Sequence, residues 1–137
     1  MTFDELTASL PNGVHDAELE KVEIDFTKRE TRLQLDLWVG DDEDKEAYRR
    51  GLVTLTGVLF WVCEPPNPGY PFGRPESVRI DGGPLAKDFP KRQPALPPIP
   101  PNAFINWLFV NEWNAFIYFA ASDASLTWLG DRTVREY

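Results

Sequence analysis

The sequence predicts a mainly β domain with a mostly antiparallel sheet, curled or in two layers, a short N-terminal helix and a proline-rich crossover. The hydrophobic residues of the best-patterned segments recur with a period of two, and short polar turns separate them, as in hairpins. All but one of the 13 prolines fall within residues 64–101. The length of 137 residues favours a single domain over residues 1–137.

The first ten residues predict a helix. Thr2 and Glu5 have the spacing of a capping box, and Phe3, Leu6 and Leu10 share one helical face. The sequence "PNG" at residues 11–13 then ends the helix.

Residues 17–39 predict a hairpin. Val22, Ile24 and Phe26 alternate with acidic residues, and leucines alternate with polar residues over 33–39 after the turn "TKRET". Ala17 and Leu19 have the opposite phase, which indicates a β-bulge near Glu20.

The later segments alternate between strands and connectors. We expect a charged loop over 40–50, one central strand over 52–63 bent at Gly57, and a short strand at "ESVRID" (76–81). The proline-rich stretch favours a stiff connector laid over the sheet rather than a peptide ligand. Residues 104–110 and 114–121 predict strands around "NEWN", although a helix stays open for 104–115, and "SLTWL" (125–129) predicts the last strand.

The composition disfavours several classes of function. The net charge of -8 opposes binding to nucleic acid. The single cysteine excludes a disulfide framework, and neither a signal peptide nor a membrane-spanning stretch is recognisable, so we expect a cytoplasmic protein without membrane contacts.

His15 and Asp16 form the first candidate for chemistry. Metal-dependent phosphohydrolases that use such a pair need further histidines, and this chain has only one. Cys63 lies in an apolar run, and no serine has the Gly-x-Ser-x-Gly context of a nucleophile. We therefore expect both side chains to bond to backbone at the start of a strand, with no metal, no cofactor and no catalytic residue.

Acidic residues elsewhere offer little chemistry. Residues 41–44 lack the glycine and the ligand spacing of a calcium loop, which favours a solvated loop. Glu112 and Asp123 are a conceivable carboxylate pair, but roles in turns are the simpler prediction.

Parts of the sequence, "HDAELEKVEIDFTKRETRLQLDLWV" and "EWNAFIYFAASDASLTWL", resemble a group of small bacterial β-rich proteins. These begin with a His-Asp-Ala turn, continue as a hairpin and close with a strand of alternating aromatic residues. Some of them have been proposed as immunity proteins against polymorphic toxins. The resemblance implies this fold and a binding role, and it brings no catalytic residues.

The leading hypothesis is a non-enzymatic domain that binds a basic protein. An aromatic residue on a polar strand face beside an acidic segment is typical of a binding anchor. The candidate binding residues are Trp38, Asp41, Asp42, Glu43, Asp44 and Trp113. The alternative is a small-molecule binder or minor hydrolase whose pocket is lined by Trp107, Trp113, Phe116 and Tyr118.

Overall fold

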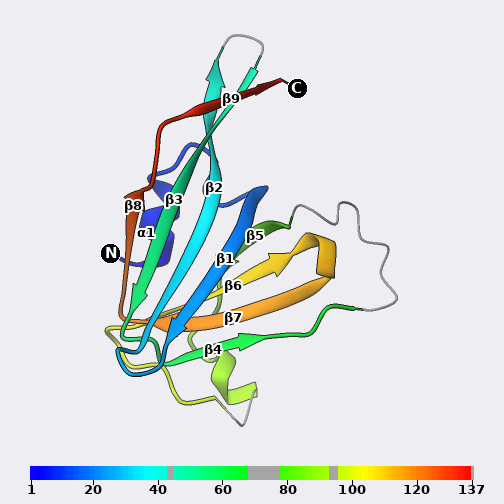
Figure 1. Cartoon of the computed structure of the whole chain (residues 1–137). Coiled ribbons are helices and arrows are strands. Elements are labelled where there is room, and N and C mark those ends of the chain that lie inside the picture. Colours follow the sequence, from blue (N-terminus) through cyan, green and yellow to red (C-terminus); the bar gives the residue numbers. More distant parts are fainter. Residues whose placement is uncertain (43–44, 68–77, 93–95, 137) are drawn as a thin grey trace.

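The computed structural model describes residues 1–42, 45–67, 78–92 and 96–136, with only the backbone of Asp42, Arg92 and Glu136. In these residues nine strands form one antiparallel sheet in the order β4-β7-β6-β5-β1-β2-β3-β8, and β9 pairs with β3 (Figure 1). The elements are α1 (Phe3–Ala8), β1 (Ala17–Asp25), β2 (Glu30–Asp42), β3 (Lys45–Thr56), β4 (Phe60–Cys63), β5 (Arg79–Pro84), η1 (Phe89–Arg92), β6 (Phe104–Val110), η2 (Asn111–Trp113), β7 (Ala115–Ala121), β8 (Asp123–Trp128) and β9 (Thr133–Glu136). The predicted fold class is confirmed.

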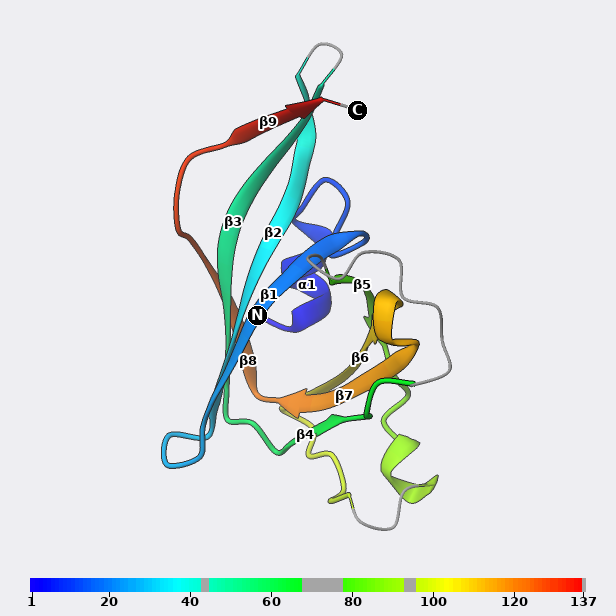
Figure 2. The same cartoon turned by 45° about the vertical axis from the view of Figure 1, so that its right-hand side comes forward.

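The sheet curls into two halves that pack against each other across the main core (Figure 2). One half contains β1, β2, β3 and β8, and the other contains β4, β7, β6 and β5. Leu33, Leu35 and Leu37 from the first half and Leu108 and Phe119 from the second are fully buried between them. The alternation that predicted the strands therefore supplies the facing sides of the core.

Helix α1 lies inside this curl, as Figure 2 shows. The predicted capping box is present, because Thr2 and Glu5 exchange hydrogen bonds between side chain and backbone. Phe3 and Leu6 are buried, and the Phe3 ring meets the Phe119 ring edge to face at 5.1 Å. The helix thus closes one side of the core. Nowhere in the described chain is a helix long and apolar enough to cross a bilayer.

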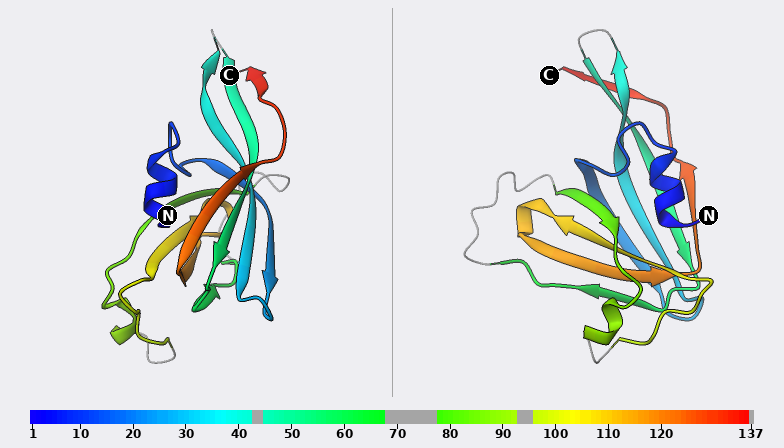
Figure 3. Two further views of the ribbon diagram at one scale, coloured as in Figure 1. Left: turned by 90° about the vertical axis from the view of Figure 1, so that its left-hand side faces the viewer. Right: turned by 180° about the vertical axis from the view of Figure 1, so that it is seen from behind.

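The predicted charged loop over 40–50 is wrong. Strands β2 and β3 continue through most of it and project beyond the rest of the sheet, with β9 alongside (Figure 3). Arg135 of β9 pairs with Asp36 and with Glu18 at 3.3 Å, and its guanidinium lies over the Tyr48 ring at 4.4 Å. These long-range contacts stabilise an extended conformation that the local composition does not favour.

The single strand expected over 52–63 is also wrong, since the chain forms two strands there. Gly57 has a φ of +61°, and a Cβ on it would lie 2.4 Å from the hydroxyl of Ser122. This turn ends β3 in the first half and sends β4 to the edge of the second half, where it pairs with β7. The expected bulge near Glu20 and the two C-terminal strands around η2 are confirmed.

The prediction of a connector laid over the sheet is confirmed for the described part of the proline-rich stretch. Leu85, Phe89, Leu96 and Ile99 pack with strand residues in a second, smaller cluster. That cluster includes Ile105, Ala120 and Phe60, which lie on the face of β6, β7 and β4 away from the main core. The connector therefore covers part of the outer face of the second half.

The two halves join where β1 meets β5. Ala17 pairs with Ile80 and Glu18 with Arg79, and the backbone N–H of Leu19 donates to the carbonyl of Val78 at 2.7 Å. Glu112 supports the joint from η2: it is buried, and its carboxylate accepts hydrogen bonds from the backbone N–H of Arg79 at 2.6 Å and from the Arg79 side chain at 2.9 Å. The conceivable pairing of Glu112 with Asp123 does not occur, because Asp123 binds the N-terminal amine instead.

We predict that Glu112→Gln destabilises the fold by about 1–3 kcal/mol at neutral pH, because it weakens a charge-assisted bond to the Arg79 side chain at the joint. Burial raises the pKa of Glu112, but the hydrogen bonds from Arg79 outweigh it, so the pKa lies below its ordinary value. The stabilisation is thus complete above the ordinary pKa of glutamate and is lost as the pH falls through the depressed value. Urea unfolding of both proteins at neutral and acidic pH should show the difference shrinking in acid, and a constant difference would contradict this role.

Candidate functional site

An aromatic groove of about 860 Å³ lies on the outer face of the second half. Trp107 and Phe109 of β6 lie beside Phe116 and Tyr118 of β7, because these residues pair across the two strands. Strand alternation points Leu108 and Ile117 into the core and these four rings to the other side. The groove is lined by His15, Asp81, Gly82, Leu85, Phe89, Trp107, Phe109, Phe116 and Tyr118.

The rings form a continuous series. Phe116 stacks on Tyr118 with centroids 5.7 Å apart, and Phe109 and Trp107 flank Phe116 at 4.9 and 6.0 Å. Phe89 of the connector contacts Tyr118 at 5.0 Å. The connector thus covers one end of the series, while the Phe116 side chain, which contacts three of the other rings, is exposed.

Gly83 allows Trp107 to lie flat on the sheet. It pairs with Trp107 across β5 and β6, and a Cβ at Gly83 would lie 2.8–2.9 Å from three atoms of the indole. A glycine opposite an aromatic residue therefore shapes this end of the groove.

Carboxylates flank the groove on two sides. Asp81 of β5 lies at one edge, and Glu64, which follows β4, accepts a hydrogen bond from the backbone N–H of Phe116 at 2.7 Å. Partial burial and then the charge of Glu64 raise the pKa of Tyr118. The groove therefore combines exposed ring surface with negative charge.

His15 stands at the edge of the groove, and the prediction that its side chain bonds to backbone is wrong. Its Nδ1 hydrogen-bonds to the carboxylate of Asp81, and its Nε2 lies 3.4 Å from Oδ2 of Asp16. The pairing of Ala17 with Ile80 brings Asp81 to this position. The hydrogen bond with Asp81 raises the pKa of His15, burial opposes the shift, and the charges of Asp81 and Asp16 add to it.

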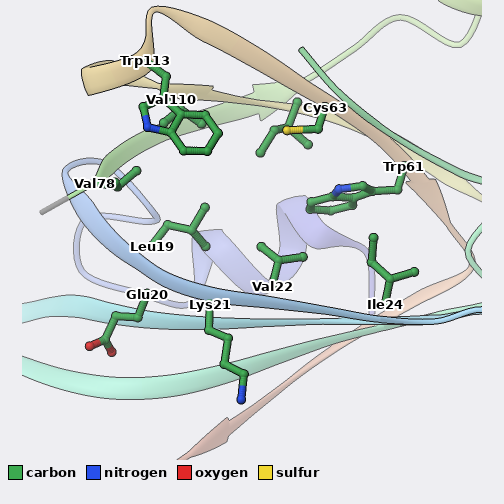
Figure 4. Close-up of a pocket in the computed structure, with 11 residues that line it drawn as sticks. Leu19, Glu20, Lys21, Val22, Ile24, Trp61, Cys63, Val78, Val110 and Trp113 are labelled. Atoms are coloured by element: carbon green, nitrogen blue, oxygen red, sulfur yellow. The ribbon is translucent and has the colours of Figure 1, made fainter. Parts of the chain in front are cut away.

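A separate cavity of about 400 Å³ opens between the two halves (Figure 4). Leu19, Val22 and Ile24 of β1 face Trp61 and Cys63 of β4 and the indole of Trp113 across it. The cavity lies just past the β1–β5 pairing, where the backbone N–H of Leu19 still donates to the carbonyl of Val78 at 2.7 Å and Val78 lines the cavity. Glu20 and Lys21 point away from the interior, which leaves apolar walls.

Cys63 and His15 belong to different sites. Cys63 lines the cavity between the halves, whereas His15 lines the outer groove. Partial burial and the neighbouring Glu64 raise the pKa of the Cys63 thiol, which disfavours the reactive thiolate. The geometry does not form a cysteine–histidine dyad.

The structure separates the residues that the sequence predicted as binding sites. Trp38 is half-buried and pairs with Tyr48 in the projecting hairpin, and Asp41 is exposed farther along that hairpin. The Asp42 side chain, Glu43 and Asp44 lie outside the described residues. The prediction of one pocket holds for Trp107, Phe116 and Tyr118 and is wrong for Trp113, which lines the cavity.

Sequence reasoning missed Asp81, Phe109 and the cavity. The two-residue spacing from Trp107 to Phe109 is a signal that places Phe109 on the same face. Asp81 carries no such signal, because its proximity to His15 depends on how β1 and β5 pair. Comparison of the chain with protein-family models, with curated proteins and with solved structures gives no match.

We predict that Gly83→Ala displaces the Trp107 indole and partly closes the groove, because the added methyl group overlaps the ring. The shift of the Trp107 indole N–H signal in NMR spectra measures the displacement. Gly130→Ala is the matched control, since a Cβ at Gly130 meets no atom within 4 Å. An unchanged Trp107 signal in Gly83→Ala would contradict the packing described.

Proposed function

We propose that this protein is a non-enzymatic binding domain of the immunity type, which acts in the cytoplasm and binds a basic protein partner. The supporting observation is the outer groove, where the exposed Phe116 ring and three half-buried rings lie between carboxylates. Lysine and arginine side chains bind the faces of aromatic rings, and nearby carboxylates strengthen that attraction. The net charge of -8 also favours association with a basic partner.

The arginine–aromatic contacts within the chain lie outside the groove. Among the described residues, Arg49 lies over the ring of Trp128 and Arg135 over that of Tyr48, both away from the groove. Phe116 is therefore the natural anchor, because it is the most central ring of the series and is partly exposed. The projecting hairpin with Trp38 and Asp41 supplies a second acidic surface for the same partner.

We predict that Phe116→Ser weakens binding of the partner about 30-fold, the usual effect of removing an aromatic anchor. The partner is captured from lysate of the source cell at low salt and identified, and its affinity is then measured with purified proteins. Binding should also weaken at high salt, because salt screens the attraction between exposed charges.

Asp41→Asn is the variant that tests the hairpin. Loss of binding in Phe116→Ser with little change in Asp41→Asn supports the groove as the main surface. A partner that is acidic, or one whose binding depends on neither salt nor Phe116, would contradict the proposal.

The cavity between the halves favours a second candidate function, the binding of a small apolar molecule. Its volume lies within the range of ligand sites, and its walls are apolar side chains with two indoles, those of Trp61 and Trp113. No charged side chain points into it in Figure 4, so an uncharged ligand suits it best.

We predict that Val22→Phe abolishes binding of the uncharged fluorophore N-phenyl-1-naphthylamine, because the larger side chain fills the cavity. Val62→Phe is the matched control, since Val62 is partly exposed on β4 between Trp61 and Cys63 and does not line the cavity. Enhanced fluorescence that is lost only in Val22→Phe supports this function. Equal fluorescence in both variants, or none in the unaltered protein, would exclude this cavity as the site.

A further inference from the structure

We propose that His15 and Asp16 bind a divalent transition ion of the zinc type at the edge of the outer groove, with Asp81 positioning the imidazole. The sequence argument against a metal counted one imidazole and one carboxylate. The ion keeps those two protein ligands, and the fold adds Asp81 as a group that orients the imidazole: ligand atoms of His15, Asp16 and Asp81 lie within 4.8 Å of one another.

The distances suit a direct bond from the ion to His15 and Asp16. Nε2 of His15 and Oδ2 of Asp16 are 3.4 Å apart. An ion about 2.1 Å from each atom, the usual length of zinc bonds to these ligands, makes an angle of about 108° with them. That angle is close to the tetrahedral value that zinc prefers.

Asp81 has the role of the outer carboxylate in a carboxylate–histidine–metal arrangement. It accepts a hydrogen bond from Nδ1 of His15, which keeps the proton on that nitrogen and leaves the lone pair of Nε2 for the ion. The same bond fixes the plane of the ring. Asp81 is thus a positioning residue, and it does not touch the ion.

The site is open to ions from solution. The side chains of His15 and Asp16 are 58% and 52% exposed, so little rearrangement precedes binding. Two protein ligands leave further coordination positions to water. Since His15 and Asp81 line the groove, a molecule bound there can replace such a water with a ligand atom of its own.

The test uses the full chain carrying Cys63→Ser, because a thiolate also binds zinc. His15 is the only histidine, so its imidazole signals in NMR spectra report the site without ambiguity. Zinc ion alone should shift these signals in a saturable manner with one equivalent bound, and the imidazole 15N shifts should assign the ion to Nε2. No shift up to about 1 mM zinc, or assignment of the ion to Nδ1, would overturn the proposal.

Variants test the contribution of each carboxylate. Asp16→Asn should lower the zinc affinity by at least about 10-fold, and Asp81→Asn by about 10-fold with the ion still on Nε2. Asp123→Asn is the matched control, because Asp123 also pairs with a nitrogen, the N-terminal amine. Equal affinity in Asp16→Asn and Asp123→Asn would overturn the proposal, and urea unfolding of each variant verifies that the fold is intact. The test needs no protein partner, so it stands apart from the function proposed above.

Discussion

The short ladder between β1 and β5 is the constraint on which the rest of the structure depends. Two residue pairs join the halves of the sheet, and Glu112 holds the Arg79 side of that joint. The cavity lies beside β1 just past this ladder, where the bulge near Glu20 falls. The same pairing carries Asp81 to His15 and Asp16 at the outer surface. The β1–β5 joint therefore sets the position of the cavity and of the His15–Asp16–Asp81 cluster.

The second half of the sheet has apolar residues on both faces, and the two faces are covered to different extents. The inner face joins the main core, whereas the proline-rich connector covers only part of the outer face. The rings that remain uncovered form the groove, and Glu64 and Asp81 add charge at its edges. Exposed aromatic surface of this kind in an acidic protein is the feature that supports the proposed binding function.

The His15–Asp16 pair shows how the meaning of a short motif depends on its surroundings. Considered alone, the pair is short of ligands for a metal and has no nucleophile nearby in the sequence. In the folded chain a carboxylate from β5 holds the imidazole, while the only thiol lines a different cavity and has a raised pKa. These arrangements disfavour a dyad of His15 with Cys63 and support the ion binding proposed above.

The sequence pattern was sufficient to predict the elements that depend on interactions between residues close together in the chain. The capping box of α1, the alternation of β1 and β2, the aromatic and β-branched content of β6 and β7, and the bulge near Glu20 follow from residues that are neighbours in sequence. Three of the four predicted pocket aromatics also lie together, since a period of two places Phe116 and Tyr118 on one face and the hairpin pairing of β6 with β7 sets Trp107 beside them. The strand character of residues 40–50, the turn at Gly57, the separation of Trp113 from Trp107 and the approach of Asp81 to His15 were decided by tertiary structure. Each depends on contacts between segments far apart in the chain, such as Arg135 with Asp36 or Ile80 with Ala17, and the energy of such contacts has no signature in local composition.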